Sequence, residues 1–351
     1  MDVFEPLPKK FSEYRIPEVV YDGRQNPTDQ EIKISVITLV YNTGKYVVEA
    51  INSLHRQWDE RIEHIIVDDT SSDNSVAEIK SHLESTQMPA LLLRNSENIG
   101  ISASKNLALE YARGEFIVGL DDDIFLRNRV EHDLGLIEKI PDTVAVITSV
   151  AKRFHQGDSI QSLEKQLQSS ERKKRRLEIV HSHQMLERLQ SKNSISAITT
   201  CIRASVIKEL RYSEGYIFED YPTWIRIAQN GHEFALSSAT TTLYRRGEHS
   251  VSNSKEFAMD FDTIRVGFDH ADWQNINFCK KQRDRWVRLV SCANEDELNK
   301  ISDWCLSNSI LRGLLLELRL RGMSSKWSWR IGNIVSNGIV GFHFFGPRTK
   351  G

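Results

Sequence analysis

The chain has 351 residues, of which 40% are hydrophobic and 27% are charged, and its formal net charge is −2 at pH 7. This composition excludes the disordered, collagen-like and coiled-coil classes, and the near-neutral charge gives no general case for a nucleic-acid partner. No apolar run approaches the roughly 18 residues that a transmembrane helix needs. The four cysteines form no CxxC pair and the first residues contain no apolar signal core, so we expect reduced thiols in a cytoplasmic protein.

Strand-like and helix-like segments alternate from residue 33 onward. We predict strands at 34–40, 64–67, 91–94 and 116–120, with helices at 46–57, 74–83 and 102–111 between them. Short, unbroken apolar runs are typical of strands buried on both faces. Their alternation with helices favours an α/β fold with a doubly wound, mostly parallel sheet flanked by helices. Residues 1–30 are polar and rich in proline, as in a tail or a strap against the body.

The pattern is looser after residue 123. We predict helices at 130–140 and 221–230, and strands at 144–148, 195–203 and 234–244. Residues 160–190 form a polar, helix-prone segment with a basic run at 171–176, which indicates either a solvated helix face or a basic patch for an anionic partner. From residue 257 onward we expect mostly helix.

Three consecutive carboxylates, Asp121, Asp122 and Asp123, follow the strand at 116–120 directly. In open α/β sheets, ligands bind at the carboxyl ends of the strands. Adjacent carboxylates repel one another unless a cation lies between them, and hard divalent cations take oxygen ligands. The sequence therefore predicts a Mg²⁺ or Mn²⁺ site that holds a phosphorylated ligand.

Polar residues also lie at the ends of two neighbouring strands. Thr38 and Tyr41 belong to the end of the first strand, and Asp69 follows the second. Because these ends converge on one crevice, Tyr41 can pack on a base and Asp69 can accept a hydrogen bond from a ring N–H. Clusters of Asp and Ser also make turns and caps, which leaves a structural role open.

Four blocks of sequence occur in the order found in family 2 glycosyltransferases of the GT-A fold, and the chain resembles that family over residues 33–250. The blocks are ISVITLVYN at 34–42, IIVDDTSSDNS at 65–75, NSENIGISASKNLALEYARGEFIVGLDDD at 95–123 and FEDYPTWIRIAQNG at 218–231. Four ordered blocks are more specific than a single DxD motif. The resemblance implies an inverting transferase that uses a nucleotide sugar, most often UDP-linked, and a divalent metal, Mn²⁺ or Mg²⁺.

On the nucleotide side, the resemblance assigns roles position by position. Tyr41 and Asp69 match positions that contact the nucleobase, and Thr38 lies in the same nucleotide-binding block. Lys105 occupies a position where arginine is commoner, and it would place a cation near the nucleotide. The proline usual in the first block is Leu39 here, and the glycine usual after the paired aspartates is Thr70; both departures concern turn geometry.

On the metal side, the resemblance concerns the DxD motif and a later basic loop. Asp121 resembles the ribose-facing carboxylate and Asp123 the metal-binding one, with Asp122 nearby. The loop at 244–252 resembles one that closes over the diphosphate. Arg246 would there bind the nucleotide, and His249 would bind the metal together with Asp121 and Asp123.

The resemblance makes Asp220 the catalytic base and Glu219 its acidic neighbour. A sugar hydroxyl is a poor nucleophile at neutral pH, so a carboxylate must take its proton. A helix N-cap is the alternative role for Asp220, which directly precedes Tyr221 and Pro222.

Two other functions remain open at this point. A sugar-nucleotide pyrophosphorylase also uses an α/β sheet, but its glycine-rich loop is not matched by residues 41–45. A catalytically silent, membrane-associated subunit is the other alternative, although a scaffold has no need of Asp121, Asp123, Asp220 and His249 together.

The last stretch, residues 304–351, has seven Lys or Arg against one acid, Glu317, with aromatic residues interleaved. It predicts either binding to an anionic membrane surface or a helical layer packed on the core. We expect a tail at 1–30, a nucleotide-sugar-binding half at 31–150, an acceptor-binding half with the base at 151–250, and a helical region at 251–351. The expected function is transfer of one sugar to a hydroxyl of a glycan or lipid-linked glycan, with donor sugar, acceptor and oligomeric state open.

Overall fold

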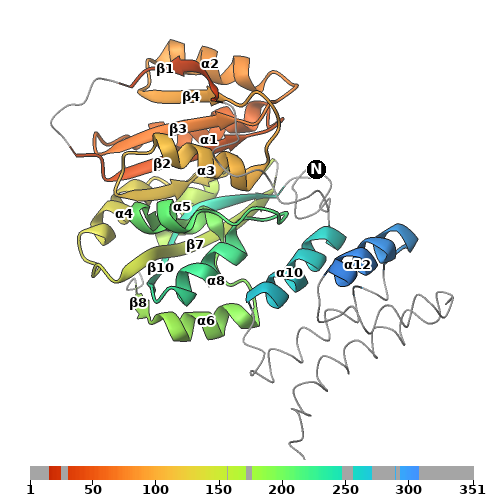
Figure 1. Ribbon diagram of the computed structural model, residues 1–351. Helices are drawn as coiled ribbons and strands as arrows, with labels where there is room; N and C mark the ends of the chain where they lie inside the picture. The colour runs from red at the N-terminus through yellow and green to blue at the C-terminus, as the bar shows by residue number, and fades with distance from the viewer. Residues whose placement is uncertain are drawn as a thin grey trace, which may run out of the picture. The chain divides into compact units, whose positions relative to one another are not determined.

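The computed structural model describes residues 16–24, 31–155, 157–170, 176–246, 256–270, 289 and 293–307. These residues belong to two compact units (Figure 1): residues 16–246 lie in the first and residues 256–307 in the second. The first unit contains described residues of both predicted halves, 31–150 and 151–250.

The first unit alternates strands and helices from its first strands onward. Its earlier elements are β1 (Glu18–Asp22), β2 (Ile34–Val40), α1 (Lys45–His55), β3 (Ile62–Asp68), α2 (Ser75–Thr86), β4 (Ala90–Arg94), α3 (Ile101–Tyr111) and β5 (Phe116–Gly119). Its later elements are β6 (Ile124–Phe125), α4 (Arg129–Ile137), β7 (Val144–His155), α5 (Ile160–Ser170), β8 (Leu177–Val180), α6 (Ser182–Ser191), the 3₁₀ helix η2 (Ala197–Thr199), β9 (Thr200–Arg203), α7 (Ala204–Leu210), α8 (Asp220–Gln229) and β10 (Glu233–Arg246).

The strands form one mixed, mostly parallel sheet flanked by helices, as the sequence predicts (Figure 1). Their order is β1-β4-β3-β2-β5-β9-β7-β10-β6, and β8 pairs with β10. The run β4-β3-β2-β5 is parallel throughout. β9 is antiparallel to both of its neighbours, β5 and β7, and it joins the predicted parallel part to the long β7–β10 pair.

Helices α1 and α2 pack on one face of β2, β3 and β4. Val47 and Ile51 of α1 and Leu83 of α2 belong to one buried cluster with Ile66 and Leu92 of the sheet. Burying an aliphatic side chain of this size contributes about 1.5–3 kcal/mol. This packing holds the loops that follow β2 and β3 at one edge of the sheet.

Four features differ from the sequence-based expectation. Residues 18–22, placed in the tail, form the edge strand β1, which pairs with β4. The segment 160–190 is not helical throughout, because β8 interrupts it and pairs with β10. The predicted strand 195–203 is strand only from Thr200, after η2, and β7 continues to His155 instead of ending at residue 148. Short or edge strands carry a weak local pattern, since their pairing partners are distant in sequence.

The second unit contains the helices α10 (Glu256–His270) and α12 (Glu295–Ser307) among its described residues, in line with the expected helical region. The ring of Phe261 packs edge-on against that of Trp304, with centroids 5.5 Å apart. Within the described ranges, no helix has the length and apolar character needed to span a bilayer. The basic run at 171–175, the loop 247–252 with His249, and the basic stretch from residue 308 lie outside the described residues.

Candidate active site

The loops that follow β2, β3, β4 and β5 meet at one edge of the sheet, because these strands are parallel. Three non-glycine residues in these loops have a left-handed backbone: Asn42 (φ 52°), Thr70 (φ 68°) and Asp121 (φ 49°). Such conformations cost roughly 1–3 kcal/mol each and cluster at functional sites. Thr70 stands where the family usually has glycine, and its positive φ gives the physical reason for that preference.

Tyr41 and Asp69 both lie at this edge, but Tyr41 is exposed and Asp69 is buried. Tyr41 is 55% exposed, so its ring is open to a ligand. The carboxylate of Asp69 is buried and accepts hydrogen bonds from the backbone N–H groups of Ile99 and Gly100 at 2.9 and 2.8 Å, and from Nδ2 of Asn95 at 2.9 Å. These bonds fix Asp69 against the loop that leads into α3. Each carboxylate oxygen has about two acceptor sites, so Asp69 can still accept a hydrogen bond from a base. That contact stays a prediction.

The aspartates 121–123 lie against the last residues of β10. Oδ1 of Asp123 accepts the backbone N–H of Arg245 at 2.7 Å, and Nε of Arg245 donates to the carbonyl oxygen of Asp122 at 2.9 Å. Burial, followed by the charge of Asp121, raises the pKa of Asp122. Burial, followed by the charge of Asp122, raises the pKa of Asp123 well above 3.8. Their surroundings disfavour the ionised forms of Asp122 and Asp123, which a bound cation would favour.

The three aspartates do not by themselves surround one point. In the part of the chain that the structure describes, no three His, Cys, Asp or Glu side chains form a group that could hold a metal ion. Mg²⁺ is usually bound by one or two carboxylates together with substrate phosphates. Asp121 and Asp123 fit this smaller donor set, and the third predicted ligand, His249, lies outside the described residues.

Lys105 of α3 connects this edge to the second acidic motif. Its buried Nζ contacts the carboxylate of Glu219 and lies 3.6 Å from Oδ2 of Asp121. Burial lowers the pKa of Lys105, but the carboxylates of Asp121 and Glu219 outweigh it, and the pKa ends above its ordinary value. Lys105 is therefore a cation between two carboxylates, and its predicted contact with the nucleotide stays a prediction.

Asp220 is the first residue of α8, and Glu219 holds the N-cap position without a side-chain capping bond. This geometry excludes the alternative role of Asp220 as the N-cap. Its Oδ1 accepts the backbone N–H of Tyr221 at 2.6 Å, and its Oδ2 accepts Nδ2 of Asn193 at 3.1 Å. Burial, followed by the charge of Glu219, raises the pKa of Asp220 to about 7. A carboxyl with this pKa exchanges a proton readily near neutral pH.

A carboxylate cluster at the strand ends, joined by a lysine to a second acidic pair, matches the resemblance in the sequence. The Glycosyl transferase family 2 model matches residues 35–210, about half of the chain. The chain belongs to glycosyltransferase family 2.

Individual relatives agree with this assignment. An uncharacterized glycosyltransferase of Methanocaldococcus jannaschii is 26% identical over 253 residues, covering 70% of this chain and 81% of the relative. The Escherichia coli UDP-Glc:alpha-D-GlcNAc-diphosphoundecaprenol beta-1,3-glucosyltransferase WfgD is 34% identical over 107 residues, covering 30% of this chain and 41% of that enzyme. The chain thus spans less than half of the length of the second relative.

Two solved structures share the fold. S. aureus TarS in complex with UDP-GlcNAc has a TM-score of 0.58 at 18% identity and covers 91% of this chain and 93% of its own. The mannosyltransferase PcManGT from Pyrobaculum calidifontis, in complex with GDP-Man and Mn²⁺, has a TM-score of 0.52 at 12% identity and covers 96% and 92%. Both likenesses show that this glycosyltransferase has the GT-A fold.

Within this glycosyltransferase, the arginine beside the aspartates is Arg245, which sequence reasoning missed in favour of Arg246. The Arg245 guanidinium lies 4.7 and 4.8 Å from the ring centroids of Tyr46 and Phe154 and pairs with Glu49 at 2.7 Å. Nε of Arg246 is buried with no hydrogen-bond partner among the described residues, and its role toward a nucleotide stays a prediction. Adjacent strand residues point to opposite faces, and the motif gave no means of choosing between the two.

Thr38 does not face the candidate site, so its assignment to nucleotide binding is wrong. Its side chain is fully buried, and Oγ1 lies 3.0 Å from Nε2 of His64. Nδ1 of His64 in turn lies 3.2 Å from Nε2 of His55 at the end of α1. The alternation along β2 turns Thr38 into the layer beneath α1.

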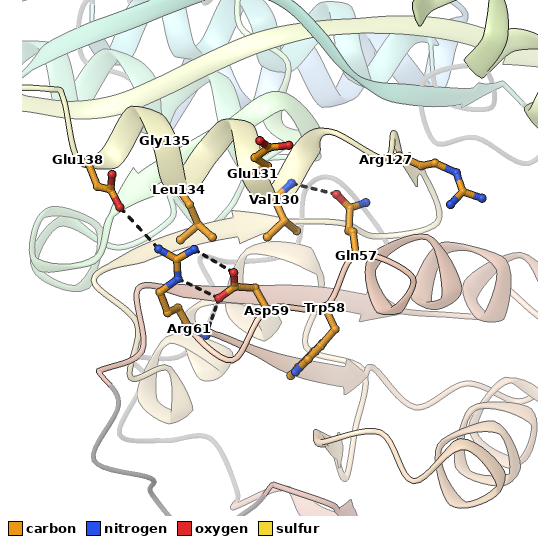
Figure 2. Close-up of a pocket in the computed structure, with 10 residues that line it drawn as sticks. All are labelled: Gln57, Trp58, Asp59, Arg61, Arg127, Val130, Glu131, Leu134, Gly135 and Glu138. Atoms are coloured by element: carbon orange, nitrogen blue, oxygen red, sulfur yellow. Dashed lines mark hydrogen bonds and ion pairs between the residues drawn. The ribbon is translucent and has the colours of Figure 1, made fainter.

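A pocket of about 290 Å³ lies away from this chemistry (Figure 2). Its wall includes residues 57–59 and 61, which precede β3, and several residues of α4. Figure 2 shows Arg61 held between Asp59 and Glu138, at 2.9 and 3.6 Å. Because residues 57–61 lead into the amino end of β3, this pocket is at the opposite end of that strand from Asp69.

Proposed function

We propose that this protein is an inverting glycosyltransferase that moves a sugar from a nucleotide sugar, UDP-linked, to a hydroxyl of a glycan or lipid-linked glycan acceptor. Such a reaction contributes to the biosynthesis of surface polysaccharide. TarS, which shares the fold, was solved with UDP-GlcNAc. The name of WfgD gives a GlcNAc-diphosphoundecaprenol acceptor, and the name of another relative, AmsB of Erwinia amylovora, gives a role in amylovoran biosynthesis.

On the donor side, the nucleotide lies at the edge where β2, β3 and β5 end. The exposed ring of Tyr41 stacks on the base, and Asp69 accepts a base N–H. Asp121 binds the ribose. Asp123, with Asp121 and His249, would hold Mn²⁺ or Mg²⁺, a fit supported by the surroundings that raise the pKa of Asp122 and Asp123. A divalent cation bound there would neutralise charge on the departing diphosphate.

On the acceptor side, Asp220 is the base. Its carboxylate takes the proton of the acceptor hydroxyl while the hydroxyl oxygen forms a bond to the anomeric carbon. The bond from that carbon to the phosphate oxygen breaks, and the nucleotide diphosphate departs from the opposite side, which inverts the configuration. Glu219 and Lys105 lie near the base, and their charges act on it in opposite directions.

One observation supports this proposal most strongly. Lys105 touches Glu219, the neighbour of Asp220, and also lies 3.6 Å from Asp121 at the end of the donor strands. The proposed donor site is therefore connected through Lys105 to Glu219, the residue next to the proposed base. Residues 95–123 and 218–231, far apart in sequence, together provide a site for donor and acceptor.

The experiment that tests this function is nucleotide release from a panel of UDP-, GDP- and dTDP-sugars, with Mn²⁺ or with EDTA. We expect release from one donor in Mn²⁺ and its loss in EDTA. Calorimetry on the same panel separates slow hydrolysis without acceptor from a failure to bind. Absence of binding to every nucleotide would contradict the proposal and favour the silent, membrane-associated subunit.

The basic stretch at 304–351 supports a lipid-linked acceptor at an anionic membrane surface. Salt-sensitive co-sedimentation with anionic vesicles is the expected behaviour. Binding that persists unchanged after removal of residues 327–351 would contradict this part of the proposal.

A further inference from the structure

We propose that Asn193 is a positioning residue that orients the carboxylate of Asp220 and favours its ionised form. The inference rests on the proposed function, in which Asp220 takes the acceptor proton. Asn193 lies in the segment between α6 and η2, 27 positions before Asp220. Its Nδ2 donates to Oδ2 of Asp220 at 3.1 Å.

The orientation of the Asn193 amide is fixed by its own turn. Oδ1 of Asn193 accepts the backbone N–H of Ile195 at 3.3 Å, and the Ile195 side chain is buried at 4% exposure. With Oδ1 turned to Ile195, the NH₂ group faces Asp220. The flipped amide would place its oxygen against the carboxylate and lose both bonds, so the observed orientation is the favoured one.

Asn193 orients Asp220 without blocking it. Oδ1 of Asp220 accepts the Tyr221 N–H of its own helix at 2.6 Å, whereas Oδ2 accepts Asn193. Among the described residues, Asn193 is the side chain that donates a hydrogen bond to this carboxylate. Each oxygen has about two acceptor sites, so Oδ2 keeps one for the acceptor hydroxyl.

The hydrogen bond from Asn193 opposes surroundings that raise the pKa of Asp220. Burial and the charge of Glu219 raise the pKa of Asp220, whereas the bonds from Asn193 and Tyr221 and the cation of Lys105 lower it. On α6, which packs against α8, Arg188 pairs with Glu178 at 2.8 Å. A donor to the ionised form favours that form, so loss of Asn193 raises the pKa of the base.

The test compares the pH dependence of kcat/KM for nucleotide release in the wild type, Asn193→Ala and Asn193→Asp. In Asn193→Ala, the acidic limb moves upward by about one pH unit, which lowers the rate about five-fold at pH 7 and little at pH 9. Asn193→Asp keeps an acceptor for the Ile195 N–H but adds a like charge, so its limb moves further. The matched control Ser194→Ala, at the exposed neighbouring position, keeps the wild-type profile.

A ¹³C NMR pH titration of the Asp220 carboxyl measures the same pKa without turnover. The resonance is assigned by its absence in Asp220→Asn. If the wild type turns over and all profiles coincide, the inference is overturned while the proposed function stands. If no protein turns over and calorimetry detects no binding of any nucleotide, the proposed function fails. The titration then decides alone: a raised pKa in Asn193→Ala supports the role of Asn193, and an unchanged pKa overturns it.

Discussion

The two acidic motifs of this protein use the same side-chain chemistry in different surroundings. Asp121, Asp122 and Asp123 follow a buried strand, and burial, followed by the charge of a neighbouring carboxylate, raises the pKa of Asp122 and of Asp123. Asp220 begins a helix, and its pKa rises to about 7 through burial and one neighbour, Glu219. Neighbouring carboxylates that disfavour one another's ionised form fit a cation site, whereas a single carboxyl that titrates near pH 7 fits proton transfer.

The largest expected effect is on the chemical step in Asp220→Asn. The amide cannot take a proton, so we expect the transfer rate to fall roughly 10²- to 10⁴-fold, with donor affinity kept. Single-turnover kinetics with saturating donor measures the rate. A variant that retains a rate within ten-fold of the wild type would remove Asp220 from the mechanism.

A large effect on folding is expected for Lys105→Met, because Lys105 lies between the two motifs. Its removal leaves Glu219 buried without its cation, and breaking a buried pair in this way costs roughly 3–5 kcal/mol in the free energy of unfolding. Lys105→Arg keeps the charge and serves as the matched control. Denaturant unfolding compares the two, and equal stability of both variants would show that the charge of Lys105 is unimportant to the fold.

A smaller effect is expected on the pH dependence of stability in Asp220→Asn. The pKa of Asp220 is raised from 3.8 to about 7, so its stabilising contribution is complete below the unfolded value and is lost as pH rises through the folded value. At pH 8 the ionised Asp220 therefore costs the wild type roughly 2–3 kcal/mol, allowing for its partial exposure. Thermal unfolding at pH 5 and pH 8 should show that the stability of Asp220→Asn relative to the wild type increases as pH rises. A difference in stability that is the same at both pH values would contradict this.

The smallest effect is expected on metal-supported donor binding in Asp123→Asn. Loss of one carboxylate should weaken donor binding in Mn²⁺ at least about ten-fold, or about 1.4 kcal/mol, and leave binding in EDTA unchanged. Asp122→Asn, which changes the adjacent carboxylate, is the matched comparison. An equal loss in both variants would assign the effect to total charge instead of a specific ligand.

The sequence predicted the donor part of the fold well for a physical reason. Strands β2 to β5 are buried and parallel, so their unbroken apolar runs stand out from the helices between them. The edge strand β1 and the short β8 depend on partners far along the chain, and their local patterns resemble those of polar segments. The family resemblance supplied the two acidic motifs and predicted the fold around them.

The contacts within the site could not be predicted from local sequence. Lys105 touches Glu219 across 114 positions, and Arg245 reaches Asp122 across 123. These contacts depend on the order of the strands in the sheet. The local sequence pattern within one block does not specify that order. Thr38 was misassigned because its place at a strand end does not reveal which face its side chain takes.

The most direct test of the division between the two motifs is donor calorimetry in Mn²⁺ on the wild type, Asp123→Asn and Asp220→Asn, using the donor identified by nucleotide release. We predict that Asp220→Asn binds the donor with wild-type affinity although it does not transfer the sugar, and that Asp123→Asn loses the Mn²⁺-dependent part of the affinity. Loss of donor binding in Asp220→Asn, or full Mn²⁺-dependent binding in Asp123→Asn, would contradict the account.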